Sequence, residues 1–221
     1  MNDELNFSRR PSASGTDSSV VLFLHGYGAD GADLLGLAEP LAQHLPDTVF
    51  IAADAPDRSM ANPMGYQWFP IPWIDGSTDA AASEGMHRSA KLLDALLDRI
   101  LAEEGIDAAR LILIGFSQGT MMSLHVAPRR VEPIAGIVGF SGRLMVPERL
   151  GEEMQSTPPV LLIHGDADDV VPFEEMQTAG EALQGAGFTV YAHVMEGTGH
   201  GIAPDGLSVA LAFIREVLDV E

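Results

Sequence analysis

Short apolar runs alternate along this chain with segments that have helical spacing. Val20–Leu24 contains five apolar residues without alternation, as expected of a parallel strand that is buried on both faces. Further strands are predicted at 49–52, 111–114, 134–140, 160–163 and 189–194. Apolar residues recur every three or four positions at 34–45, 86–100 and 207–218, and helices are also expected near 118–127 and 173–184. This alternation predicts a mostly parallel, doubly wound α/β sheet in one domain over residues 20–221.

Two segments lack either periodicity. Residues 1–19 are polar, which predicts a flexible N-terminal arm with at most a short edge strand around Leu5 to Phe7. Ala55 to Thr78 contains prolines that exclude a long helix, together with several aromatic residues. A loop of this length in a compact domain usually has a function.

Composition excludes several classes of function. The net charge of −20 argues against binding to nucleic acid and against stable membrane attachment, because both surfaces are anionic. The absence of cysteine excludes disulfides and a cysteine nucleophile. No signal-peptide pattern or membrane-spanning apolar run is present, so we expect a cytoplasmic protein. The sequence does not separate a salt-rich habitat from other origins of the acidic surface.

The stretch LILIGFSQG at 111–119 carries the clearest chemical signal. An apolar strand leads into Gly115-Phe116-Ser117-Gln118-Gly119, and helix-forming residues follow, which is typical of a strand–turn–helix with a nucleophilic serine at its apex. The glycines permit close approach of strand and helix. The backbone N–H of Gln118 then lies at a helix N-terminus, where it can stabilise negative charge on a substrate oxygen.

The partners that a serine nucleophile needs follow later strands. Asp166, Asp168 and Asp169 come after the strand at 160–163, and His200 lies in a glycine-rich loop after the strand at 189–194. Histidine can activate a serine hydroxyl at neutral pH, and a carboxylate can orient the histidine. Residue types alone leave the choice among the three aspartates open. His25 and His164 with His200 could form a metal site, but no helical histidine pair supports one, so no metal or other cofactor is expected.

The motifs LHGYGADG, GFSQG, HGDADDVVP and GTGHGIAP together resemble the carboxylesterase/phospholipase family of α/β hydrolases, which includes the acyl-protein thioesterases. The resemblance spans residues 20–218 and implies an α/β-hydrolase fold. It assigns the catalytic carboxylate to Asp168, beside Ser117 and His200, and the second oxyanion amide to Tyr27. It also places the aromatic loop over the cleft, with Trp68, Phe69, Trp73 and Val171 as the expected substrate pocket.

The resulting hypothesis is a serine carboxylesterase that forms an acyl-enzyme on Ser117. Only about twenty residues separate the strands at 134–140 and 160–163, which leaves no room for a cap domain and favours small to medium acyl esters. The alternatives are an acyl-protein thioesterase, a lysophospholipase, and a catalytically silent hydrolase-fold binding module. Thr120, at a position where glycine is frequent in the thioesterases, favours the carboxylesterase. The resemblance also suggests a homodimer, while substrate identity and stereochemical preference stay open.

Overall fold

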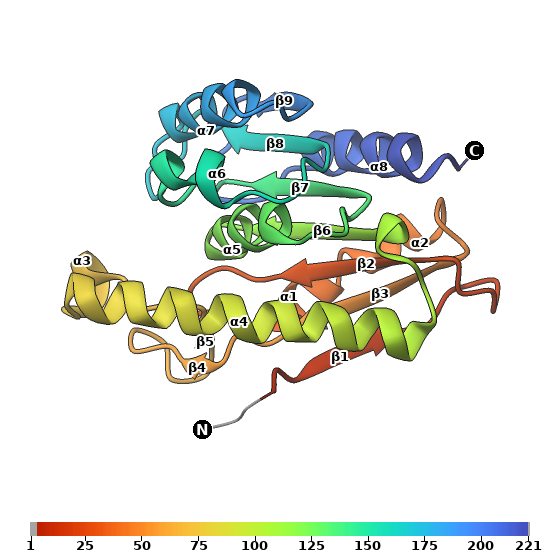
Figure 1. The fold of residues 1–221 in the computed structure, drawn as a ribbon, viewed down its shortest axis with the longest axis horizontal. Helices are drawn as coiled ribbons and strands as arrows, with labels where there is room; N and C mark the ends of the chain where they lie inside the picture. The colour runs from red at the N-terminus through yellow and green to blue at the C-terminus, as the bar shows by residue number, and fades with distance from the viewer. Residues whose placement is uncertain (1–3, 221) are drawn as a thin grey trace.

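A central sheet organises the residues that the computed structural model describes, which are 4–220 (Figure 1). Its strand order is β1-β3-β2-β6-β7-β8-β9, with β1 antiparallel to β3 and every other pair parallel. The prediction of a mostly parallel α/β sheet is therefore confirmed. The strands are β1 (Phe7–Arg10), β2 (Ser19–Leu24), β3 (Thr48–Ala53), β6 (Leu111–Phe116), β7 (Gly136–Phe140), β8 (Val160–Gly165) and β9 (Val190–Met195).

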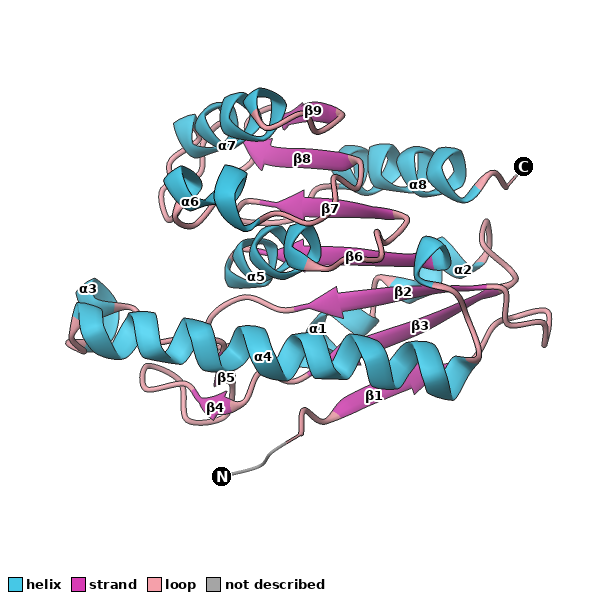
Figure 2. Ribbon diagram, viewed as in Figure 1, coloured by secondary structure: helices cyan, strands magenta, loops and turns pink. Residues whose placement is uncertain are grey.

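Helices cover both faces of the sheet (Figure 2). Alternate residues of a strand point to opposite faces, so Val20 and Leu22 pack on one side while Val21 and Phe23 pack on the other. This arrangement explains why the central strands are apolar throughout. The first face carries α4 (Asp79–Glu104), α5 (Gln118–Val126), α6 (Pro147–Glu153) and α7 (Glu174–Gly185), and the second carries α1 (Gly31–Leu35), α2 (Ala38–Ala42) and α8 (Pro204–Leu218).

The helix expected at 34–45 is interrupted. It is divided into α1 and α2, and the amide of Glu39 donates to the carbonyl of Gly36 at 3.2 Å as the chain re-enters a helix. Pro40 lacks an N–H and cannot donate to Gly36 in an unbroken helix. The predicted distortion thus takes the form of a break before α2.

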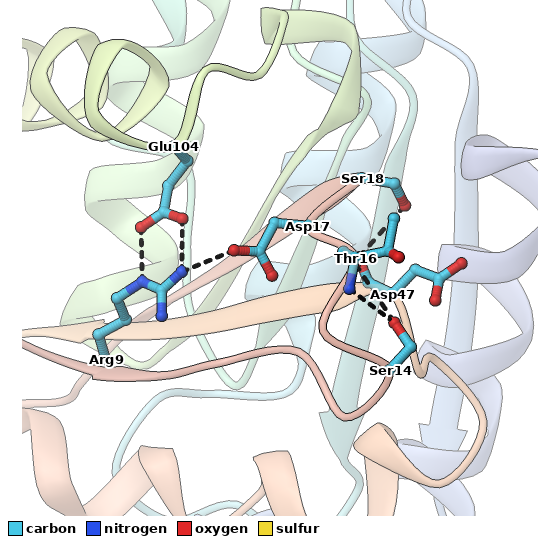
Figure 3. A network of polar contacts seen from close by, with 7 residues as sticks. All are labelled: Arg9, Ser14, Thr16, Asp17, Ser18, Asp47 and Glu104. Carbon is cyan, nitrogen blue, oxygen red and sulfur yellow. Dashed lines mark hydrogen bonds and ion pairs between the residues drawn. The ribbon is translucent and has the colours of Figure 1, made fainter.

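The N-terminal segment contains the edge strand that its sequence allowed. The strand β1 lies at residues 7–10 rather than around Leu5 to Phe7, and Leu5 before it is 3% exposed. Arg9 donates to both carboxylate oxygens of Glu104 at 2.7 Å and to Asp17 at 2.9 Å (Figure 3). A polar composition does not exclude a strand here, because β1 lies at the edge of the sheet and an edge strand has one solvated face. Residues 1–3 lie outside the described part of the chain.

The aromatic loop and the connection after β7 are both ordered pieces of structure. Within the loop, β4 (Asp57–Arg58) and β5 (Tyr66–Gln67) form a small antiparallel pair, and α3 (Pro72–Asp75) follows. Between β7 and β8, the structure contains the single short helix α6 and no cap domain. Over residues 4–220, no helix combines the length and the apolar character that crossing a membrane requires.

One buried histidine of α5 affects stability. His125 is 6% exposed, and its Nδ1 has no hydrogen-bond partner within residues 4–220. The pKa of His125 is lowered to about 4, chiefly by burial and in smaller part by the nearby Arg129 and His87. The neutral imidazole is therefore the form that fits the fold.

We expect the free energy of unfolding to decrease as the pH falls from about 6.5 to about 4. In this range His125 binds a proton in the unfolded chain but stays neutral in the folded protein. The contribution is at most about 3 kcal/mol for such a pKa difference. Urea unfolding across this pH range should show a smaller decrease for His125→Gln than for wild type. Parallel pH profiles for the two proteins would contradict the assignment.

Candidate active site

Ser117 occupies the sharp turn between β6 and α5. Its backbone has φ 53° and ψ −114°, a conformation that non-glycine residues rarely adopt. The Ser117 amide donates to the carbonyl of Phe140 at 2.9 Å, and its carbonyl accepts from Met121 at 3.1 Å. These bonds hold the strained residue at the carboxyl edge of the sheet. The turn from Gly115 to Gly119, called the elbow below, has the strand–turn–helix shape that the sequence predicted.

Glycines at both ends of this turn let the helix approach the sheet. A Cβ atom on Gly115 would lie 2.4 Å from the Thr120 amide, and one on Gly119 would lie 1.8 Å from the Leu24 carbonyl oxygen. Neither position can accept a side chain without moving backbone. The contact with Leu24 also sets the N-terminus of α5 against the end of β2, where the loop containing Tyr27 begins.

Asp168 and His200 form a hydrogen-bonded pair after β8 and β9. His200 Nδ1 lies 2.8 Å from Asp168 Oδ2, and the Asp168 side chain is fully buried. Its Oδ1 accepts from the amides of Val170 and Val171 at 2.9 Å each. Burial alone would raise the pKa of Asp168, but the hydrogen bonds from His200 and the two valine amides lower it. A carboxylate that accepts from Nδ1 leaves the lone pair of His200 on Nε2.

Two packing contacts place the His200 loop beside the serine turn. Its ring lies 4.8 Å from the ring of Phe116, the residue directly before Ser117. Gly165 permits the approach of the histidine loop, because a Cβ there would lie 2.1 Å from the carbonyl oxygen of Thr198. Within residues 4–220, neither Nε2 of His200 nor Oγ of Ser117 has a hydrogen-bond partner. Direct proton transfer between them stays a prediction.

The other two aspartates have different positions. Asp166 is exposed, and its Oδ1 accepts from the amide of Gly197 at 2.6 Å, so it supports the loop that carries His200. Asp169 is exposed and makes no hydrogen bond within the described residues. The geometry therefore favours Asp168, the residue that the resemblance indicated.

The remaining histidines at strand ends have structural contacts. His25 Nδ1 lies 2.7 Å from the Gly26 carbonyl, and its Nε2 accepts from the Ala55 amide at 3.0 Å. Burial lowers the pKa of His25, in agreement with a neutral ring. His164 Nε2 lies 2.9 Å from the Val171 carbonyl and 3.2 Å from Asp168. Neither ring is free to bind a metal at these nitrogens.

The two predicted oxyanion amides are unoccupied by protein acceptors within residues 4–220. The adjacent amides of Gly28 and Ala29 donate instead to the carbonyls of Tyr66 and Gly26. The Tyr27 hydroxyl donates to Asp75 at 3.2 Å, a contact that sequence reasoning missed. This hydrogen bond connects the segment after β2 that carries Tyr27, called the oxyanion loop below, to the end of α3.

The side chain of Gln118 attaches the aromatic loop to the elbow. Its Oε1 accepts from the Trp68 amide at 3.1 Å, and its Nε2 donates to the Phe69 carbonyl at 2.8 Å. Trp68 is fully buried and donates from its indole to the carbonyl of His25 at 3.0 Å. The aromatic loop is thus fixed both to the nucleophile turn and to the oxyanion loop.

A cavity of about 220 Å³ lies between the aromatic loop, the start of α4 and the segment after β7. Phe69 and Trp73 line it, whereas Trp68 and Val171 do not, and the role of all four residues in substrate binding stays a prediction. Met86, Arg143 and Met145 also line it. Sequence reasoning did not single out Arg143, which lies three residues after β7.

Comparisons with known proteins agree with this architecture. The model of the phospholipase/carboxylesterase family matches residues 11–218. The chain belongs to this family. An acyl-protein thioesterase 1 from Gibberella zeae is 30% identical over 220 residues, which cover 93% of each chain.

Solved structures of the family have the same fold. The crystal structure of esterase PE8 has a TM-score of 0.92 and 44% identity, and covers 97% of this chain and 100% of its own. That of Zea mays acyl-protein thioesterase 2 has a TM-score of 0.76 and 28% identity, and covers 96% of this chain and 99% of its own. The α/β-hydrolase fold is thereby confirmed, and the family consists of hydrolases.

The carboxylate assignment predicts unequal effects of substitution. Asp168→Asn should lower kcat on a p-nitrophenyl ester by roughly 10⁴-fold, as loss of the carboxylate in a related triad does, because an amide no longer stabilises the required tautomer. Asp169→Asn is the matched control, since its exposed side chain makes no hydrogen bond in the described structure. Equal turnover by wild type and Asp168→Asn would show that another carboxylate orients His200.

Proposed function

We propose that this chain is a serine carboxylesterase that hydrolyses small to medium acyl esters through an acyl-enzyme on Ser117. The observation that carries the proposal is the pair of His200 and buried Asp168 next to the strained serine turn. This arrangement combines a nucleophile, a base and an orienting carboxylate at one edge of the sheet. The family relatives named esterases and thioesterases support the same chemistry.

Each group has a defined role in the proposed reaction. Ser117 Oγ attacks the ester carbonyl while His200 Nε2 accepts its proton. The carbonyl oxygen becomes negatively charged and accepts hydrogen bonds from the amides of Tyr27 and Gln118. The alcohol leaves with the proton from His200, and a water molecule activated by the same histidine then releases the acid. Throughout this cycle, Asp168 stabilises the protonated imidazole.

The cavity at the aromatic loop supports the proposed preference for small to medium esters. Its volume of about 220 Å³ suits a short apolar chain better than a long one. The connection between β7 and β8 contributes only α6 and adds no cap. Rising turnover up to long-chain acyl esters would contradict this preference.

Thioesterase and lysophospholipase activity use the same chemistry and stay as alternatives. The hydroxyl of Thr120 lies 2.8 Å from the carbonyl oxygens of Gly115 and Phe140, and its hydrogen bonding stabilises the turn around Ser117. This gives Thr120 a structural role that leaves the choice of substrate open. Competition between an acyl thioester and its matching oxygen ester would distinguish the activities. A cytoplasmic location and a homodimer also stay predictions.

A fluorophosphonate probe tests the proposed nucleophile. Wild type should be labelled covalently and should hydrolyse p-nitrophenyl butyrate, whereas Ser117→Ala should do neither, because the attacking oxygen is missing. Ser123→Ala is a matched control, since that hydroxyl lies in the same helix and bonds the Gly119 carbonyl. Absence of labelling in folded wild type would instead favour a silent binding module.

A further inference from the structure

The cavity at the aromatic loop has a cationic side chain in its wall. Arg143 lines this cavity together with the apolar Phe69, Met86 and Met145. Its guanidinium lies 5.6 Å from the ring centroid of Trp73, which also lines the cavity. Within residues 4–220, Arg143 makes neither an ion pair nor a hydrogen bond, although its side chain is half-buried.

Arg143 lacks the acidic partner that most arginines in this chain have, such as Glu153 for Arg129. The sequence contains 32 Asp and Glu against 12 Lys and Arg. Within residues 4–220, two other partly buried arginines have no acidic partner: Arg110 donates to backbone carbonyls, and Arg215 forms no ion pair. Arg143 differs from these two because it lines an apolar cavity, where its N–H donors have no acceptor among the described residues. An anion that enters the cavity would supply the missing acceptor.

Two residues of the cavity wall are connected to the serine turn. Arg143 follows Gly142, whose Cβ, if present, would lie 3.0 Å from the Ser117 carbonyl oxygen. Phe69 accepts a hydrogen bond from Gln118, the residue after Ser117. These contacts place the segments that carry Arg143 and Phe69 beside the serine turn.

We propose that Arg143 makes this enzyme accept esters that carry a carboxylate on the part of the substrate occupying the cavity. Phe69, Met86 and Met145 would contact a short run of methylene groups, and the guanidinium would bind the carboxylate through paired N–H donors. Half-esters of dicarboxylic acids have this pattern. The inference rests on the proposed esterase activity and specifies its substrate class.

The exposed carboxylate of Asp79 also lines the cavity and opposes such a ligand. It lies beyond ion-pair distance from Arg143, because no contact within 4.0 Å joins them. Its exposure to water weakens its repulsion of a bound anion relative to the attraction of a half-buried guanidinium. The two side chains thus predict opposite effects on the same substrates.

Two pairs of substrates test whether the cavity accepts the acyl part or the alcohol part of the ester. In the first pair, mono-p-nitrophenyl adipate carries the carboxylate on the acyl part, and p-nitrophenyl hexanoate is its neutral match. In the second pair, the butyrate ester of 4-hydroxyphenylacetate carries it on the alcohol part, and 4-ethylphenyl butyrate is the neutral match. The measured quantity is the ratio of kcat/KM for charged and neutral esters. Comparing this ratio between wild type and a variant largely cancels the repulsion of the charged ester by the acidic surface as a whole.

In one of the two pairs, Arg143→Gln should reduce this ratio about tenfold, the loss typical of a hydrogen bond to a charged group. The neutral ester should be hydrolysed as by wild type. Arg143→Lys, which keeps the charge without the planar stack on Trp73, should retain most of the ratio, and Asp79→Asn should increase it. Added salt should reduce the difference between the wild-type ratio and that of Arg143→Gln, because it screens the attraction by the guanidinium.

Equal losses on charged and neutral esters in Arg143→Gln would overturn the inference, because they would mean that Arg143 only holds Trp73 in place. An unchanged ratio in both pairs would overturn it as well. Hydrolysis of the neutral esters in these cases would leave the proposed esterase intact. Failure of wild type to hydrolyse any of the four esters would instead refute the proposed function and the inference together.

Discussion

The close approach of α5 to the sheet is the constraint on which the site depends. The Gly119 backbone lies so near the Leu24 carbonyl that no side chain fits between them, and Gly115 has the same relation to Thr120. This contact forces Ser117 into its strained conformation and places the amide of Gln118 next to the loop after β2. The proposed nucleophile and the two amides proposed to bind the oxyanion therefore lie close to one backbone contact.

The second requirement is a buried negative charge in a protein that is already strongly acidic. The Asp168 side chain is fully buried, and removing a carboxylate from water costs several kcal/mol when it has no partners. Two backbone amides and the rings of His200 and His164 surround it at 2.8 to 3.2 Å. These contacts keep the carboxylate charged and aimed at His200. The surface charges are solvated and screened, so they have little influence on this pair.

The aromatic loop has two functions that its composition did not separate. Trp68 is a fixed part of the scaffold, because its indole and amide bond to His25 and Gln118. Phe69 and Trp73 instead line the cavity, and Trp73 is 72% exposed. One segment thus connects the loop that carries Tyr27, the serine turn and the cavity. Hydrogen bonds to backbone groups hold its buried end in place.

The sequence by itself determined the order of strands and helices, the serine turn, and the set of aspartates and histidines that follow later strands. These features depend on local apolar spacing and on glycine sterics, which are readable along a chain. The tertiary structure decided that the polar segment at 7–10 is an edge strand, because its partners Ala53 and Glu104 are distant in sequence. It also decided that Asp168 rather than Asp169 meets His200, and that Arg143 enters the cavity wall. These outcomes depend on which segments meet in the folded protein. Neighbouring residues of the same type, such as Asp168 and Asp169, have the same local chemistry, so the sequence alone does not show which of them makes the contact.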